Sequence, residues 1–167
     1  ITGGSGSWGN ELTKQLLEKY NPKEIRIYSR GEIKQWQMKK KFSSPKLKFI
    51  IGDVRDEERL MVSMRDVDIV FHLAALKHVP VCEENPDEAV LTNITGTQNI
   101  VHAAIKNNVK MVVDVSTDKA VDPLNLYGVT KACGERLAIA ANNEFGITKF
   151  VCVRGGNVLG TNGSVVP

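Results

Sequence analysis

The sequence lacks long apolar runs, and no stretch approaches the roughly 18 consecutive apolar residues of a membrane-spanning helix. Its first residues show no signal-peptide pattern. Cysteines are few, and Cys82, Cys133 and Cys152 have the spacing of neither a disulfide framework nor a metal site. We therefore expect no membrane segment in this chain, no metal site, reduced thiols and a cytoplasmic location.

A strong excess of one charge is also absent. The formal net charge is +3, which is too small, and the basic residues are too scattered, to predict a nucleic-acid partner. The densest basic run, Lys39–Lys41, is typical of a solvated helix face. The slight basic bias still suits an anionic ligand.

Short apolar runs alternate with helical patterns along the chain. The predicted strands cover residues 25–28, 47–51, 68–73, 111–115 and 150–153, and the predicted helices cover 12–20, 60–64, 89–107 and 127–142. The strands are nearly continuous in Val, Ile and Phe, which is typical of parallel strands buried on both faces. The alternation predicts an α/β fold, a doubly wound Rossmann-type parallel sheet of six or more strands.

Residues 1–167 are accordingly predicted to form one domain. Because Ile1 and Thr2 lie directly before a glycine-rich loop, we expect the first strand to be truncated.

The glycine-rich loop Thr2–Gly9 lies between a strand end and an amphipathic helix. One glycine permits a tight turn, another lets the backbone approach a pyrophosphate, and the last allows close packing of helix on sheet. The alternative is a glycine-rich turn without a ligand. The strand before the loop, the helix after it and a second strand about twenty residues later favour a dinucleotide site. The predicted cofactor residues in this loop are Gly3, Gly6, Ser7, Trp8 and Gly9.

The end of the second strand bears on the choice of cofactor. An NAD enzyme usually carries Asp or Glu there, whereas this chain has Ser29 and Arg30, with Lys34 one helical turn later. A hydroxyl and two cations favour NADP, with NAD as the alternative, unless Arg30 is only a surface residue. Asp53 and Val54 end the third strand, where a carboxylate would accept from the adenine amino group or simply stabilise a turn.

Polar side chains at the end of the strand 111–115 indicate a catalytic site. Ser116, Thr117, Asp118 and Lys119 follow it, at the sheet edge where open α/β sheets bind ligands. Tyr127 and Lys131 follow on one face of one helix. A nearby ammonium lowers the pKa of a tyrosine, so that the phenol could act as a base. The alternative is a tyrosine at the edge of the core and a solvated lysine.

On these motifs the chain resembles the extended short-chain dehydrogenase/reductases. More narrowly, it is similar to the UDP-N-acetylglucosamine 4,6-dehydratases of polysaccharide and flagellin-sugar biosynthesis. The resemblance covers essentially the whole chain and implies that residues 1–167 form one NAD(P)-binding Rossmann domain. It also implies that the C-terminal substrate-binding region is missing from this chain, so the piece alone should bind cofactor weakly and turn over little substrate. It rests on Thr2–Gly9, Tyr28–Arg30, Ile51–Asp56, Ala74–Pro80, Asn93, Ser116–Lys119, Asn125–Gly128, Lys131, Gly156–Val158 and Gly163–Pro167.

The resemblance implies a catalytic division of labour. Tyr127 takes the proton of the C4 hydroxyl, assisted by Lys131, and Thr117 bonds the C4 oxygen. Lys119 removes the C5 proton, and protonated Asp118 helps to expel the C6 hydroxyl as water. An Asp-Lys pair at this position is the one carried by members that also invert C5.

The resemblance also implies binding residues and partners. The cofactor would be lined by Ala74, Ala75, Lys77, Tyr127 and Lys131. Lys77, Thr117 and Asn157 would contact a substrate that is UDP-N-acetylglucosamine or a related UDP-sugar. A homo-oligomer is the expected assembly. Gly155 departs from the family, which usually has an aromatic residue there. Two alternatives stay open: a UDP-sugar 4-epimerase, which needs Tyr127 but not the Asp-Lys pair, and a non-catalytic NADP-binding regulator.

Overall fold

The computed structural model describes residues 1–143 and 146–158 of the chain. The segment 163–167, which contributes to the resemblance, lies outside the described residues. Five strands appear, each within two residues of its predicted bounds. They are β1 (Ile25–Ser29), β2 (Leu47–Ile51), β3 (Ile69–His72), β4 (Met111–Thr117) and β5 (Lys149–Gly155).

The strands form one parallel sheet whose order reverses near the start of the chain. β1 pairs with β2, and β4 pairs with both β3 and β5, always in parallel. Thr2 joins the two halves through parallel bridges to Tyr28 and His72. The order is therefore β2–β1–Thr2–β3–β4–β5, which is the doubly wound arrangement with its switch point at Thr2. The predicted fold class is confirmed.

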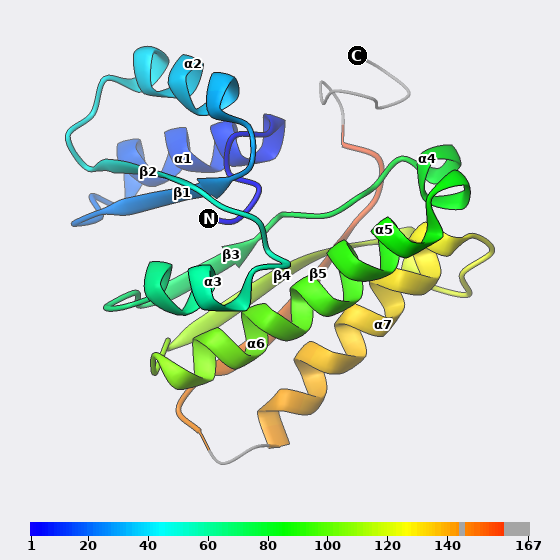
Figure 1. The fold of residues 1–167 in the computed structure, drawn as a ribbon. Coiled ribbons are helices and arrows are strands. Elements are labelled where there is room, and N and C mark those ends of the chain that lie inside the picture. Colours follow the sequence, from blue (N-terminus) through cyan, green and yellow to red (C-terminus); the bar gives the residue numbers. More distant parts are fainter. Residues whose placement is uncertain (144–145, 159–167) are drawn as a thin grey trace.

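Helices pack on the two halves of the sheet from opposite sides. α1 (Ser7–Lys19) and α2 (Glu32–Phe42) lie with β1 and β2, while α3 (Glu57–Ser63), α6 (Gly96–Lys106) and α7 (Leu126–Ala140) lie in front of β3–β5 (Figure 1). Right-handed crossovers explain the division, because strand order runs in opposite directions from Thr2.

Local sequence sets where several helices begin. Asp56 accepts a hydrogen bond from the Arg59 backbone N–H at 2.9 Å and so caps α3, and Asn125 caps α7 through Gly128. The predicted helix 89–107 is three consecutive helical segments, α5 (Pro86–Val90), a π-helical turn (Leu91–Thr95) and α6. The short helix α4 (Val79–Glu84) was not predicted. No helix among the described residues is long and apolar enough to cross a membrane.

The main core lies between the sheet and the layer of α3, α6 and α7. Its fully buried members include Leu60, Ile100, Val109 and Val112. A smaller cluster of Ile25, Ile27 and Met38 lies beneath α2. Two clusters on opposite faces are what a doubly wound sheet requires.

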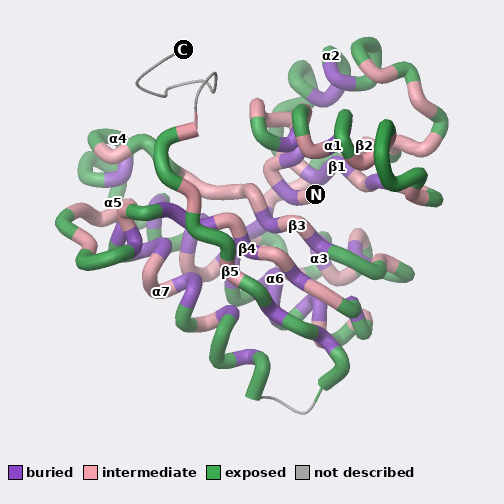
Figure 2. Tube along the Cα trace, turned by 180° about the vertical axis from the view of Figure 1, so that it is seen from behind, coloured by how far each residue is buried: buried purple, intermediate pink, exposed green. Residues whose placement is uncertain are grey.

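The other face of β3–β5 differs from the expectation of burial on both faces. Ile69, Val151 and Val153 are between 43% and 49% exposed, and β5 alternates between exposed and less exposed residues. In the view from behind, no helix of the described residues lies over these strands (Figure 2). The apolar strands are thus covered on one face only within this part of the chain.

Candidate functional site

The glycine loop folds as its sequence predicts. Gly3 has φ +64°, and a Cβ there would lie 2.8 Å from the Ala74 backbone nitrogen. A Cβ on Gly9 would lie 2.1 Å from the Gly4 carbonyl oxygen, so α1 packs against the loop at a distance that only glycine allows. Gly6 is the N-cap of α1. The turn and the close packing are therefore both present at the switch point.

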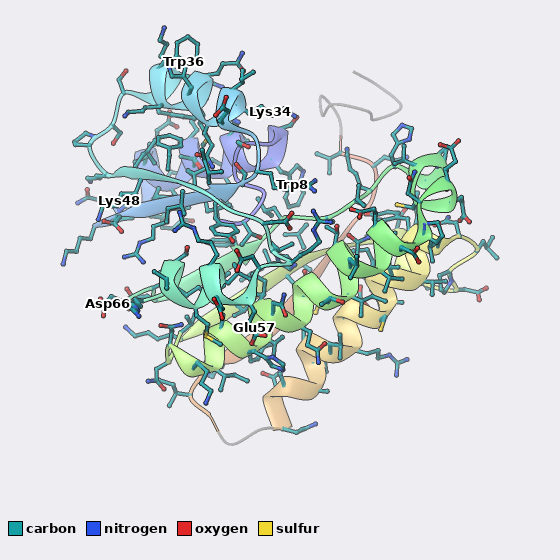
Figure 3. The ribbon with its side chains drawn as sticks, in the orientation of Figure 1. Trp8, Lys34, Trp36, Lys48, Glu57 and Asp66 are labelled. Atoms are coloured by element: carbon teal, nitrogen blue, oxygen red, sulfur yellow. The ribbon has the colours of Figure 1, made fainter. Side chains whose placement is uncertain are left out.

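A hollow of about 800 Å³ lies beside this loop. Its lining includes Ser5, Gly6, Ser7 and Trp8 from the loop and Lys34 from α2. Figure 3 labels the side chains of Trp8 and Lys34. A Cβ on Gly6 would meet only the Gly3 carbonyl oxygen within 4 Å, so the space before the helix N-terminus is open. Backbone N–H groups and the helix dipole favour an anion at such a place. The residues present therefore fit a pyrophosphate-bearing cofactor.

Ser29 and Arg30 stand at the end of β1 as predicted. The Ser29 hydroxyl accepts hydrogen bonds from Ser5 Oγ at 2.8 Å and from Gln35 Nε2 at 3.0 Å, which ties strand, loop and α2 together. The Arg30 side chain is 57% exposed, and its Nη1 lies 3.8 Å from Asp53 Oδ2. Arg30 is therefore exposed beside Asp53, whereas Ser29 holds the loop in place.

Asp53 is bound by a residue that the sequence analysis did not single out. Arg55 donates to its carboxylate from the backbone N–H at 3.0 Å and from the guanidinium at 3.0 and 2.7 Å. Burial works against the charge of Asp53, but the hydrogen bonds from Arg55 prevail and lower its pKa. Val54 is buried, and a Cβ on Gly96 of α6 would lie 2.7 Å from its Cγ2. Neither Asp53 nor Val54 is among the described residues that line the hollow.

The loop 73–78 after β3 carries Ala74, Ala75 and Lys77 toward the same edge of the sheet. Asn93 holds it: its Oδ1 accepts from the Leu76 N–H at 2.8 Å, and its Nδ2 donates to the Leu76 carbonyl at 2.9 Å. The same Nδ2 donates to Thr130 Oγ1 of α7 at 3.0 Å. Asn93 lies on the π-helical turn, a feature often found at functional sites. Lys77 is exposed on this loop.

The predicted strand-end cluster assembles directly after β4. Thr117 Oγ1 donates to Asp118 Oδ1 at 3.0 Å, and Lys119 Nζ donates to the same oxygen at 3.2 Å. Lys119 Nζ also lies 3.4 Å from Asn157 Oδ1. The Thr117 hydroxyl, followed by Lys119, lowers the pKa of Asp118. The structure therefore brings four predicted site residues together at the carboxyl edge of the sheet.

Tyr127 stands beside this cluster at the start of α7. Burial raises its pKa, and a hydrogen bond with Thr117 opposes that rise in part. The sequence analysis expected Lys131 to lower the pKa of Tyr127, and here the structure differs. Lys131 Nζ is directed to Asp114 Oδ1 at 3.3 Å, so a carboxylate offsets the field of the ammonium.

Four residues of this region were missed as contributors: Gln35, Arg55, Asp114, and Asn93 beyond its place in a motif. Asp114 alone left a usable signal, since a carboxylate inside the apolar run 111–115 is unusual for a buried strand. The contacts of Gln35 and Asn93 join different segments, so no local pattern predicts them. Arg55 lies only two positions from Asp53, but no motif predicts their bond.

Known proteins match this chain in sequence over its whole length. A family model described as "Polysaccharide biosynthesis protein" matches residues 1–167. The chain is 54% identical over 169 residues to a UDP-N-acetylglucosamine 4,6-dehydratase (inverting) of Campylobacter jejuni, covering 100% of this chain and 51% of that protein. It is 51% identical over 172 residues to a protein named UDP-glucose 4-epimerase from Rickettsia canadensis, covering 100% of this chain and 50% of the relative.

Two solved structures share the fold closely. Pen from Bacillus thuringiensis superposes with a TM-score of 0.95 at 44% identity, covering 99% of this chain and 52% of that one. A dTDP-glucose 4,6-dehydratase, DesIV from Streptomyces venezuelae with NAD bound, gives a TM-score of 0.83 at 27% identity, covering 92% and 53%. The chain thus spans about half the length of the curated relatives it matches.

Proposed function

The chain belongs to the polysaccharide biosynthesis protein family, and from this premise we propose that it is the cofactor-binding domain, residues 1–167, of an NADP-dependent UDP-N-acetylglucosamine 4,6-dehydratase. The proposal includes inversion at C5 and a cytoplasmic, homo-oligomeric enzyme. The observation that carries it is the cluster of Thr117, Asp118 and Lys119 beside Tyr127, at the carboxyl edge of β4. The three free cysteines are consistent with a reducing compartment.

The glycine loop and its hollow would hold the dinucleotide. Gly6 and Ser7 would offer the helix N-terminus to the pyrophosphate, and Arg30 and Lys34 would bind a 2′-phosphate. When bound, the nicotinamide supplies the acceptor that takes a hydride from C4 of the sugar and later returns it to C6. NAD remains the alternative cofactor, because the related DesIV structure holds NAD.

Tyr127 is the proposed base at C4. Its phenolate would accept the hydroxyl proton, and Thr117, which bonds both Tyr127 and Asp118, would hold the C4 oxygen. Oxidation to a 4-ketone makes the C5 proton acidic. The same side chains that define the sheet edge therefore prepare the sugar for elimination.

Lys119 and Asp118 need the opposite charge states from those of an ion pair. A base at C5 requires neutral Lys119, and an acid at C6 requires protonated Asp118. One proton moving from Lys119 Nζ to Asp118 Oδ1, across 3.2 Å, supplies both forms without changing the net charge. Exclusion of water favours the neutral pair, so we propose that substrate binding drives this shift.

Product NMR on the protein that contains this chain tests the proposal, with UDP-N-acetylglucosamine and NADP in deuterated water. A 4-keto-6-deoxy product with deuterium at C5 and inverted configuration is the expected result. The same product with C5 retained would remove the inversion from the proposal. Absence of any 4-keto-6-deoxy sugar would contradict the dehydratase.

A UDP-sugar 4-epimerase is the second candidate, favoured by the 51% identity to the relative from Rickettsia canadensis. That reaction uses a base such as Tyr127 but leaves C5 and C6 untouched, so the cluster of Asp118 and Lys119 would have no task. The C4 epimer without deuterium would support it. Cofactor binding without turnover would instead support a non-catalytic regulator.

A further inference from the structure

Lys131 is the largest fully buried side chain of the described residues. Its side chain is 2% exposed, and its Nζ lies 3.3 Å from Oδ1 of Asp114, whose side chain is 1% exposed. Withdrawing two charges from water is expensive, and their mutual attraction repays the cost only in part. Lys131 lies one helical turn after Tyr127. Stability alone therefore does not explain why this pair is buried so deeply.

Asp114 lies in a row of side chains that crosses the sheet. In register it faces His72 of β3 on one side and Cys152 of β5 on the other. Burial lowers the pKa of His72 to about 4 and raises the pKa of Cys152 to about 11, so both neighbours are neutral near pH 7. Neither of them therefore balances the lysine.

Two more ionisable side chains lie one turn from Lys131 on α7, and Cys82 and Asp118 also act on Tyr127 from outside that helix. Glu135, one turn after Lys131, gives both carboxylate oxygens to Arg154 at 2.9 and 2.6 Å. Tyr127, one turn before, is neutral because burial raises its pKa. Asp114 is thus the carboxylate that pairs with Lys131 within the part of the chain that the structure describes.

The two oxygens of Asp114 differ in their surroundings. Asp114 Oδ2 is buried and has no hydrogen-bond partner among the described residues. Here one oxygen faces the ammonium and the other is left unsatisfied.

We propose that Asp114 is a positioning residue for Lys131, the buried counter-ion that keeps its ammonium charged and fixed on α7, one helical turn after Tyr127. The inference rests on the proposed function, in which Tyr127 is the base and Lys131 its cationic neighbour. Without the carboxylate, burial disfavours the ammonium, and Tyr127 loses that neighbour as the pH rises. The carboxylate also raises the pKa of Tyr127. The pair therefore keeps the Lys131 ammonium charged, but it makes the Tyr127 hydroxyl a weaker acid.

The first test is the pH profile of kcat/KM in the protein that contains this chain. Asp114→Asn keeps the shape and removes the charge. We expect it to match or exceed the wild type at the acidic end, where the carboxylate no longer raises the pKa of Tyr127, and to fall at least about tenfold below it by pH 9, where burial disfavours an unpaired ammonium. Asp114→Glu, which restores the charge, should recover most of that loss. A constant ratio of Asp114→Asn to wild type at every pH would overturn the proposal.

The second test needs no catalysis and so separates this inference from the proposed function. Urea unfolding at pH 7.5 is measured for Asp114→Asn, Lys131→Met and the double variant. We expect the double variant to be more stable than either single one, because it leaves no lone buried charge. If the losses of unfolding free energy in the two single variants add up in the double variant, the pairing is refuted. This test still applies if Asp114→Asn is inactive at every pH. Asp68→Asn, which removes an exposed carboxylate paired with Lys110, is the control and should change neither readout.

Discussion

The ammonium nitrogen of Lys119 lies 3.2 Å from Oδ1 of Asp118, in a pair whose side chains are 37% and 57% exposed. Thr117 and Lys119 lower the pKa of Asp118, and both members of the pair remain open to a substrate. Pairs this exposed add little to stability, so removing either partner tests chemistry and not folding.

Lys119→Met should stop the dehydration. Without a base at C5 we expect kcat to fall by roughly 10²- to 10⁴-fold, as for other general bases, with cofactor affinity unchanged. Product formation by NMR and cofactor titration by fluorescence measure the two quantities. Lys110→Met, which removes the lysine of another exposed pair, is the matched control. An unchanged kcat in Lys119→Met would leave the C5 role without support.

Tyr127→Phe should abolish the pH dependence on the acidic side of the profile. Burial raises the pKa of Tyr127, so its phenolate is scarce near neutral pH and the rate should increase with pH. Removing the hydroxyl should lower kcat by roughly 10²- to 10⁴-fold and flatten that limb. The control is Tyr20→Phe on an exposed tyrosine. A sloping limb that survives in Tyr127→Phe would assign the base to another group.

Arg30→Ala and Lys34→Ala should weaken NADP more than NAD. Each loses a charge-assisted contact with the 2′-phosphate, worth about 1.5–3 kcal/mol, which corresponds to roughly 10- to 100-fold in Kd. Calorimetric titration with both dinucleotides gives the ratio. Lys48→Ala, on an exposed lysine paired with Glu24, should leave it unchanged. Equal losses for both dinucleotides would contradict a 2′-phosphate site.

His72 should make the protein less stable in acid. Burial lowers its pKa from 6.5 to about 4, so the unfolded chain binds the extra proton between these values. The contribution is complete above pH 6.5 and is lost as the pH falls toward 4; it amounts to about 3 kcal/mol. Urea unfolding at pH 7.5, 5.5 and 4.5 measures the loss.

His72→Asn should reduce the slope of stability against pH in that window, although it also removes the contacts to Thr2 and Thr97. The exposed His102, which bonds Glu57, provides the control variant His102→Asn. If the slope persists in His72→Asn, other groups are responsible for it.

Much of this protein could be predicted from local pattern. The strand 47–51 consists mostly of Leu, Phe and Ile. The loop Thr2–Gly9 has glycine at Gly3, Gly4 and Gly9, where a Cβ would clash. The cluster 117–119 could be placed at the sheet edge because it directly follows a parallel strand. These features depend on neighbours in sequence or on the common direction of parallel strands, and both are visible in one dimension.

Other features depend on where distant segments meet. Asn93 binds Thr130 across 37 positions, Arg26 reaches the Ser63 carbonyl across 37, and Asp114 meets Lys131 across 17. The uncovered face of β5 likewise follows from which helices pack where.

The sequence by itself determined the alternation of strands and helices, the glycine loop and the identities of Asp118, Lys119, Tyr127 and Lys131. Only the tertiary structure decided the charge environment of those side chains. A hydrophobic period is a property of adjacent residues, whereas the field at a side chain sums over all charges near it in space. Lys131 illustrates the difference. Its spacing from Tyr127 can be read from the sequence, but only the folded structure brings the carboxylate of Asp114 next to it.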